Sequence, residues 1–312
     1  MFPPTGSRRA GNPRRPAFTL IEMLVVIAII AVLGTLTAGV VLKFMTGQPI
    51  TNTKVGLKKM QTMAHKRWVE VTEQAKREAI QGVYLTAVQS LSSDSATQRV
   101  IYIKIKQKQA FPETFFEAIN PLVIGSGASA VTIPAVPGYV QFLKNNAITT
   151  GSQTAPQNYE SAVCLLMALK RSVSGGTIND QDLGLTPSIN TTIVPGGAPC
   201  LCDGWGNPIG FCRWPLGNPN ATAGDPTDPG KLLENNNNWT ATGKATFGST
   251  IHVIGTTAAP GNLTPMLASA GSSSGVLNQI LTVGQPGTLT QWSIPAANAA
   301  AANSVIYSNN LP

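Results

Sequence analysis

The hydrophobic pattern is most distinctive near the N-terminus of the chain. Residues 23–42 contain no charged residue and no proline. Twenty residues of α-helix rise about 30 Å, which is the thickness of the hydrocarbon core of a bilayer. The pattern therefore predicts a membrane-spanning helix over residues 18–46. A signal peptide is the alternative interpretation: its apolar core is shorter, at about 7–15 residues, and residues 37–39 would offer a small-residue cleavage site.

The pattern changes after this apolar segment. Apolar and charged residues over 54–81 are spaced as in an amphipathic helix, with an apolar stripe on one side and charges on the other. Residues 47–49 read Gly-Gln-Pro, which predicts a kink or break, because proline lacks the backbone N–H and crowds the preceding turn. Thr51 or Asn52 is then the expected cap of the next helix. We therefore expect a separate amphipathic stalk helix over residues 50–81.

Residues 82–312 show weaker patterns, which predict a mixed head of short helices and strands. Apolar residues alternate over Val100–Lys106, which predicts a strand with Ile101, Ile103 and Ile105 facing inward. Further elements are expected as follows: helices over 112–120 and 158–172, strands over 209–214, 251–254 and 265–268, a loop over 125–138 and a surface turn over 235–238. The 30 glycines and 23 prolines favour a loop-rich body with β-strands over a helical bundle.

The positive charge of the chain is unevenly distributed. The formal net charge is +8, and half of it comes from four arginines that precede the apolar segment: Arg8, Arg9, Arg14 and Arg15. By the positive-inside rule, these arginines lie in the cytoplasm and the residues after Lys43 lie outside it. Many of the other basic residues fall on the expected stalk helix, where a solvated helix face is the ordinary explanation and acidic lipid the alternative. This distribution argues against a nucleic-acid partner.

One acidic residue, Glu22, lies at the edge of the apolar segment. An ionisable group in a membrane segment is costly, so it is a candidate functional residue by default. The alternative is that Glu22 lies at headgroup depth, where a carboxylate is tolerated. If the chain is cut before Phe18, the new ammonium lies four residues from Glu22. The two charges can then neutralise each other, or their counterparts on a neighbouring subunit, and set the axial register between packed helices.

The residues around Glu22 carry a resemblance to a known family. Phe18-Thr19-Leu20-Ile21-Glu22, followed by the apolar run and preceded by basic residues, resembles the prepilin cleavage and methylation motif of type IV pilins and type II secretion pseudopilins. The resemblance implies that a prepilin peptidase cuts between Ala17 and Phe18 and methylates the new amine. It also implies that Glu22 guides insertion of the subunit into a filament. Ala17 departs from the glycine that the family usually has there.

This resemblance also implies an architecture and a set of partners. The fold would be α+β: a long N-terminal helix, membrane-spanning in its first part, carries a mixed head on an antiparallel sheet. The expected organisation is a basic leader over 1–17, an assembly helix over 18–46, a stalk helix over 50–81 and a periplasmic or extracellular head over 82–312. Expected partners are the prepilin peptidase, other pilin-like subunits, an inner-membrane assembly platform and the lipid bilayer. The chain would be a single-pass inner-membrane protein before it enters a pseudopilus or cell-surface filament.

A second stretch extends the resemblance into the head. The run D-G-W-G-N-P resembles a segment of major pseudopilins that leads into the first strand of their C-terminal sheet; it comprises Asp203, Gly204, Trp205, Gly206, Asn207 and Pro208. These residue types favour a tight turn, and the tryptophan is expected to anchor it to the core. Residues 269–275 resemble a turn that contributes to a calcium site in the same family. Ser273 replaces its aspartate, so no metal or other cofactor is expected; calcium is the alternative, with Asp203, Asp225 and Asp228 as oxygen donors.

The four cysteines fall in the expected head, where disulfides are permitted. Cys200 or Cys202 is a candidate partner of Cys212 across the predicted turn, and Cys164 could join from the preceding helix. Buried free thiols rank second, and a zinc site ranks third because the C-x-C spacing is unusual and no histidine lies near it in sequence.

No motif predicts a catalytic site. The chain has two histidines and lacks G-x-S-x-G, H-E-x-x-H and P-loop patterns. We therefore expect a structural subunit with no catalytic residues rather than an enzyme. The alternative is a membrane-anchored or secreted binding protein that uses its β-rich head as a ligand surface.

Overall fold

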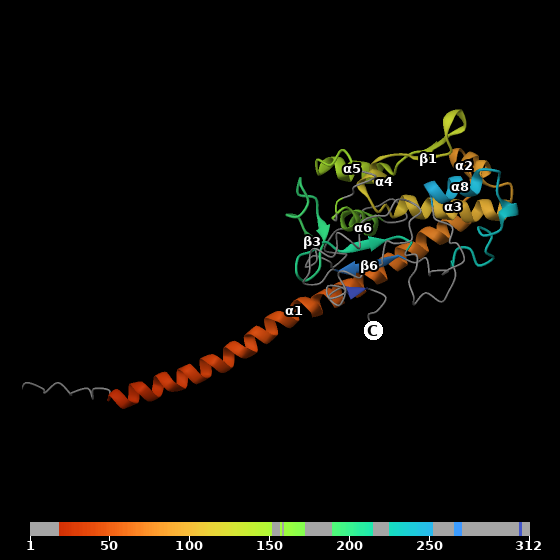
Figure 1. Cartoon of the computed structure of the whole chain (residues 1–312). Helices are drawn as coiled ribbons and strands as arrows, with labels where there is room; N and C mark the ends of the chain where they lie inside the picture. Colours follow the sequence, from red (N-terminus) through yellow and green to blue (C-terminus); the bar gives the residue numbers. More distant parts are fainter. Residues whose placement is uncertain are drawn as a thin grey trace, which may run out of the picture. The chain divides into compact units, whose positions relative to one another are not determined.

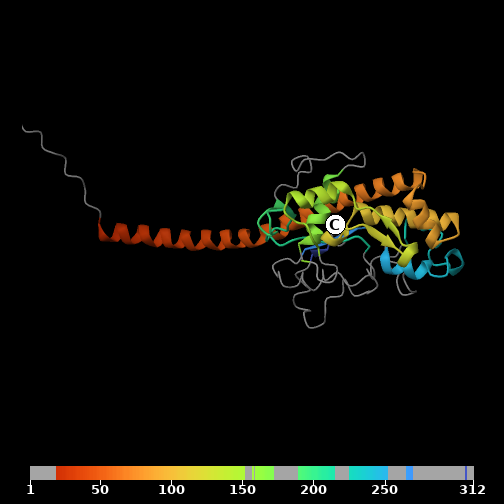
Figure 2. The same cartoon turned by 90° about the horizontal axis from the view of Figure 1, so that it is seen from above.

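The computed structural model describes residues 19–151, 157, 159–171, 189–214, 225–251, 265–269 and 306–307 (Figures 1 and 2). The chain divides into two compact units, Met1–Gln48 and Pro49–Pro312. The first helix, α1 (Leu20–Arg77), contributes to both units, and each unit is described by itself below.

In the first unit, the described residues form the beginning of α1. The segment Leu20–Thr37 is long and apolar enough to cross a membrane, and none of it is buried. Within it, the hydroxyl of Thr35 donates to the carbonyl of Val32, and that of Thr37 donates to the carbonyls of Leu33 and Gly34. The two polar side chains thus satisfy their donors on the helix itself, as an apolar environment requires. Thr19 lies before the helix rather than inside it, and residue 18 lies outside the described residues.

The backbone stays helical through Pro49, so the predicted break and new cap at Thr51 or Asn52 are wrong. The hydrogen bond that Pro49 cannot make is the one from its own backbone nitrogen to the carbonyl four residues earlier. One turn later, the hydroxyl of Thr53 donates to the carbonyl of Pro49 at 2.7 Å. The amphipathic pattern after Pro49 therefore continues an existing helix.

In the second unit, α1 provides the long side of the hydrophobic core. Its buried residues recur every three or four positions, which places them on one face of the helix. They are Leu57, Met60, Ala64, Trp68, Val71 and Ala75. The rings of Trp68 and Phe111 lie 5.4 Å apart, which ties this face to the end of α3.

The other helices of the second unit pack around this core. They are α2 (Val83–Leu91), α3 (Ser95–Ala110), α4 (Phe115–Ile119), α5 (Pro137–Asn145), α6 (Glu160–Lys170) and α8 (Gly243–Thr250), with 3-10 turns η1 (Gly127–Ser129) and η3 (Asn236–Asn238). Every residue from Glu160 to Leu169 is buried, so α6 is enclosed on all sides. The helices predicted over 112–120 and 158–172 correspond to α4 and α6.

The strand predicted over Val100–Lys106 is wrong, because this segment lies inside helix α3. Asp94 caps the helix: its Oδ2 accepts from the backbone N–H and the hydroxyl of Thr97 at 2.7 and 2.6 Å. The helix buries residues on most of its circumference, including Lys104 and Gln107. A helix buried all around has no polar face, and its sequence can then imitate the alternation of a strand.

The strands are short and form small antiparallel sheets. One pairs β1 (Leu122–Ile124) with β2 (Val131–Ile133), and a second pairs β3 (Ile189–Asn190) with β4 (Cys200–Leu201). The third has the order β5-β6-β7, formed by Gly210–Cys212, Met266–Ser269 and Ile306–Tyr307. The head is therefore a mixed α+β structure, consistent with a pilin-like fold.

The structure also tests the strands and the loop that were predicted in this unit. The strands expected over 209–214 and 265–268 correspond to β5 and β6, which pair with Phe211 opposite Leu267. The expected loop over 125–138 instead contains β2 and the start of α5. In the strand expected over 251–254, Ile251 directly follows α8, and residues 252–254 lie outside the described residues.

Candidate processing and assembly segment

The N-terminus of α1 is closed by a reciprocal cap between Thr19 and Glu22. The backbone N–H and the hydroxyl of Thr19 donate to Glu22 Oε2 at 2.8 and 3.0 Å, and the backbone N–H of Glu22 donates to Thr19 Oγ1 at 3.3 Å. This is a capping box, in which two otherwise unsatisfied backbone donors find side-chain acceptors. Sequence reasoning singled out Glu22 but missed Thr19, although the spacing T-x-x-E before an apolar run was the available signal.

The cap gives Glu22 a defined orientation. Both Thr19 donors reach the same oxygen, Oε2, and Oε1 makes no hydrogen bond within the part of the chain that the structure describes. The carboxylate also lies in the first turn, where the helix dipole favours negative charge. One oxygen of Glu22 thus belongs to the cap, and the other can accept from a further donor.

The large apolar side chains near Glu22 are not covered by the described residues of their own unit. Large hydrophobic residues from Leu20 to Leu36 are exposed, most of them by about half or more, and Leu20 reaches 83%. Exposure of a continuous apolar surface of this kind marks a segment that functions against lipid or another protein. The predicted processing residues Ala17 and Phe18 lie outside the described residues.

The turn predicted in the head is present and is organised by Asp203. Its Oδ1 accepts from the backbone N–H groups of Trp205 and Asn207 at 3.0 and 2.9 Å, while Oδ2 accepts from the hydroxyl of Ser269 at 2.6 Å. Gly206 donates to the carbonyl of Asp203 and has a φ of 85°, which favours glycine. Burial raises the pKa of Asp203, and the hydrogen bonds from Ser269, Asn207 and Trp205 oppose that rise.

Trp205 is not the anchor of this turn, which corrects the prediction. Its side chain is only half-buried, whereas Asp203, Pro208 and Ile209 are buried. The turn is held from inside by the Asp203 carboxylate and by an isolated antiparallel β-bridge of the backbone between Cys202 and Pro208. Small polar groups close a turn more tightly than a tryptophan ring can, because they replace the missing backbone hydrogen bonds directly.

The turn also packs against α1 near Pro49, where the second unit begins. The backbone N–H of Gly204 donates to Thr53 Oγ1 at 2.8 Å, and Thr53 in turn donates to the carbonyl of Pro49. A Cβ atom at Gly204 would lie 2.4 Å from the Pro49 carbonyl oxygen. Only glycine permits this approach, so Gly204 connects the turn to the helix that carries the assembly segment.

The four cysteines are buried, and Cys164, Cys200 and Cys202 are free thiols. The thiol of Cys202 contacts the carbonyl of Cys200 at 3.5 Å. Burial raises the pKa of Cys164, so its thiol stays protonated and unreactive. Because Cys200 and Cys202 are free in the structure, the disulfide to Cys212 that ranked first from the sequence is not formed there.

The carboxylates considered for calcium have other partners. Asp225 contacts Lys104, and Asp228 accepts from the backbone N–H groups of Leu232 and Leu233 at 2.8 Å. Among the described residues, no three side chains of His, Cys, Asp or Glu come together as a metal site would require. Of the turn expected over 269–275, Ser269 ends β6 and bonds to Asp203, while 270–275 lie outside the described residues.

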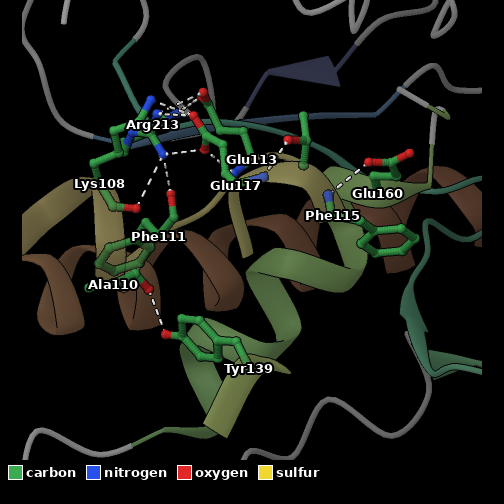
Figure 3. Close-up of polar contacts among 10 residues, drawn as sticks. Lys108, Ala110, Phe111, Glu113, Phe115, Glu117, Tyr139, Glu160 and Arg213 are labelled. Carbon is green, nitrogen blue, oxygen red and sulfur yellow. Dashed lines mark hydrogen bonds and ion pairs between the residues drawn. The ribbon is translucent and has the colours of Figure 1, made fainter. Parts of the chain in front are cut away.

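A buried ionic network links α3 and α4 to Arg213, the residue that follows β5 (Figure 3). Arg213 contacts Glu117 at 2.9 Å and Glu113 at 3.2 Å, and it donates to the carbonyl of Phe111 at 2.6 Å. Lys108 contacts the other oxygen of Glu117 at 2.5 Å. Burial acts to raise the pKa of Glu117, but Arg213 and Lys108 lower it far below its usual range. These charges satisfy one another, as buried charges must.

A cavity of about 360 Å³ lies beside this network. Its lining combines Lys108 and Glu117 with Phe116, Pro134 and Tyr139. The Tyr139 hydroxyl donates to the carbonyl of Ala110 at 2.7 Å, and burial raises the pKa of Tyr139 to about 12. The cavity has the size of a small-molecule site, but its main polar groups already have partners in the protein.

Comparison with known proteins finds one similarity. Residues 12–38 match the family model of the prokaryotic N-terminal methylation motif. No curated protein and no solved structure matches the chain. The match covers the expected cleavage site, the Thr19–Glu22 cap and the exposed apolar helix, and it confirms the motif identified from the sequence.

Proposed function

We propose that this chain, which is type IV pilin-like by its N-terminal methylation motif and hence a substrate of prepilin peptidase, is a structural subunit of a secretion pseudopilus or a pilus-like filament. The observation that carries the proposal is the combination of this motif with an apolar helix whose large side chains are left exposed by the described residues. A pilin-like subunit needs such a helix twice: first in the membrane and then between neighbouring subunits.

The physical basis of assembly is the exposed surface of Leu20–Thr37. In a bilayer, this surface faces lipid and its backbone donors are satisfied within the helix. In a filament, the same surface packs against equivalent helices of other subunits. The charge of Glu22 then becomes decisive, because a carboxylate in an apolar helix bundle requires a positive partner. The ammonium that cleavage before Phe18 would create is that partner.

The proposed membrane topology of the chain follows from the basic residues before the helix. They hold the leader in the cytoplasm, so that the head lies in the periplasm. The inner-membrane assembly platform would then collect processed subunits from the bilayer. The head has a structural role in this proposal and no catalytic one, which agrees with the lack of catalytic sequence motifs.

The N-terminal sequence and intact mass of the mature protein, isolated from its own membranes, test the proposal. A start at Phe18, with or without a methyl group, is the expected result. A start at Met1 would mean a simple membrane anchor, and either this start or one near Gly39 would remove the basis for filament assembly. The start near Gly39 would favour a secreted binding protein, for which the 360 Å³ cavity is the candidate ligand site.

A deletion of the gene separates the two kinds of filament. Loss of a secreted enzyme from the culture medium, with surface fibres retained, would assign the subunit to a secretion pseudopilus. Loss of surface fibres with secretion retained would assign it to a pilus.

A further inference from the structure

A lysine in the centre of α3 lies in an unusual environment. The side chain of Lys104 has no exposed area, although lysine is among the residues that are least often buried. Its Nζ lies 2.6 Å from Asp225 Oδ2, but it makes no hydrogen bond of good geometry in the described part of the chain. An ammonium has three N–H donors. The hydrogen-bonding capacity of the Lys104 ammonium is therefore not filled by the described residues.

Burial favours the neutral amine of Lys104. Burial lowers the pKa of Lys104, while the charges of Asp225 and Asp228 oppose this effect. On another side, the centroid of the Trp214 ring lies 5.7 Å from Nζ, and this contact attracts the ammonium. In such a site, proton transfer from the ammonium to the carboxylate replaces two buried charges by two neutral groups. A neutral lysine amine is a nucleophile.

The two oxygens of the Asp225 carboxyl group have different contacts. Oδ1 accepts from the backbone N–H of Thr227 at 2.9 Å and from its hydroxyl at 2.7 Å. Oδ2 faces Nζ of Lys104. Two donors on Oδ1 are placed to stabilise negative charge that develops on this oxygen when a nucleophile attacks the carboxyl carbon.

We propose that Lys104 and Asp225 condense spontaneously in the folded head to form an intramolecular amide. A proton first passes from Nζ to Oδ2, and Nζ then attacks Cγ while Oδ1 takes up the charge beside Thr227. A second proton passes from Nζ to Oδ2, the Cγ–Oδ2 bond breaks, and water leaves. The ammonium and the carboxylate thus become one amide and one water, with no oxidant, reductant or cofactor.

Proximity of a lysine and a carboxylate is not sufficient for amide formation, as a neighbouring ion pair illustrates. Lys108 and Glu117 are even closer, at 2.5 Å. Glu117, however, also binds Arg213 and the backbone N–H of Glu113, so four donors hold it as a carboxylate. A carboxylate is a poor electrophile, and Lys108 keeps partial contact with solvent. Lys108 therefore provides the matched control.

The amide would join the middle of α3 to the turn that begins at Asp225. Such a bond closes a long loop of the chain and restricts the unfolded state, as a disulfide does. It would also resist reduction. This property suits a head that works outside the cytoplasm, and it does not depend on whether the chain forms a filament.

Peptide mapping of the full-length protein, purified in detergent, tests the proposal. Trypsin should yield one branched peptide in which Val100–Lys106 is joined to Trp214–Lys231, with cleavage after Lys104 blocked and the mass of one water missing. Lys104→Arg and Asp225→Ala should abolish the branched peptide, whereas Lys108→Arg should leave it unchanged. Asp225→Asn should restore the link with loss of ammonia instead of water.

The wild-type protein decides the question even if a variant fails to fold. Recovery of the two peptides as separate species of full mass, from protein with an intact near-UV circular dichroism spectrum, would overturn the proposal and leave a buried ion pair. Recovery of a branched peptide through Lys108 would also contradict it.

Discussion

Replacement of Gly204 by alanine tests the docking of the Asp203 turn on α1. The added Cβ would lie 2.4, 2.8 and 2.9 Å from the carbonyl oxygen, Cα and carbonyl carbon of Pro49. All three are backbone atoms, so no side-chain rotation can relieve the overlap. The turn must instead move away from the helix, and the 2.8 Å hydrogen bond from Gly204 to Thr53 would break.

The expected loss of stability follows from these two effects. Insertion of a methyl group into a well-packed contact costs about 1–3 kcal/mol. Loss of the hydrogen bond adds about 1 kcal/mol. The free energy of unfolding of the head should therefore fall by about 2–4 kcal/mol. For a domain of this size, each kcal/mol lowers Tm by about 2–4 °C, which gives a decrease of roughly 4–16 °C.

Thermal unfolding followed by near-UV circular dichroism in detergent measures this decrease. The matched control is Gly248→Ala in α8, where an added Cβ meets no atom within 4 Å. Alanine is also the better helix former, so this control should leave Tm unchanged or raise it slightly. A Gly204→Ala protein that unfolds at the wild-type temperature would refute the close approach of the turn to Pro49.

Three further predictions concern the charged groups. Glu22→Ala should prevent incorporation into sedimentable filaments while leaving Tm of the head unchanged. Glu22→Gln keeps a cap acceptor without the charge and should also prevent incorporation, so normal filaments from Glu22→Gln would exclude a role of the charge. Glu117→Gln should lower the free energy of unfolding by about 3–5 kcal/mol in denaturant titrations, because it removes one of the two carboxylates that face the buried Arg213. The control Glu73→Gln, at an exposed pair, should leave the free energy of unfolding nearly unchanged. The pKa of Glu117 is lowered in the folded state, so Glu117 is protonated in the unfolded chain first as the pH falls through 4.5. The free energy of unfolding of the wild type should therefore decline below that pH, and that of Glu117→Gln should decline more weakly.

The N-terminal segment was predictable from the sequence because its signal is local. An uninterrupted apolar run, a basic stretch before it and one carboxylate at a fixed position are all visible without knowledge of the fold. The turn at Asp203 was predictable for the same reason, since aspartate, glycine, asparagine and proline determine backbone geometry within a few residues. The wrong anchor, Trp205, shows the limit of local reasoning: whether a ring is buried depends on what packs against it.

The strand wrongly predicted over Val100–Lys106 shows why other parts were not predictable. Alternation of apolar residues with Tyr102, Lys104 and Lys106 suggested one buried and one solvated face. In the structure, the polar residues are also largely enclosed, because their partners come from distant segments. Lys104 meets Asp225, and Lys106 lies 3.2 Å from Glu78 and over the ring of Tyr84. A lysine that finds its counter-charge far away in sequence cannot be distinguished locally from one that faces water.

The cap at Thr19 changes how the charge of Glu22 should be understood. A carboxylate free to rotate at the start of an apolar helix would turn toward headgroups, and its pairing with an ammonium would cost side-chain entropy. The cap fixes Oε2 on Thr19 and leaves Oε1 as the acceptor for a further donor. An ammonium at residue 18 would adjoin this cap directly. Thr19 is thus expected to position Glu22 for whichever ammonium it meets, that of its own chain or that of a neighbouring subunit.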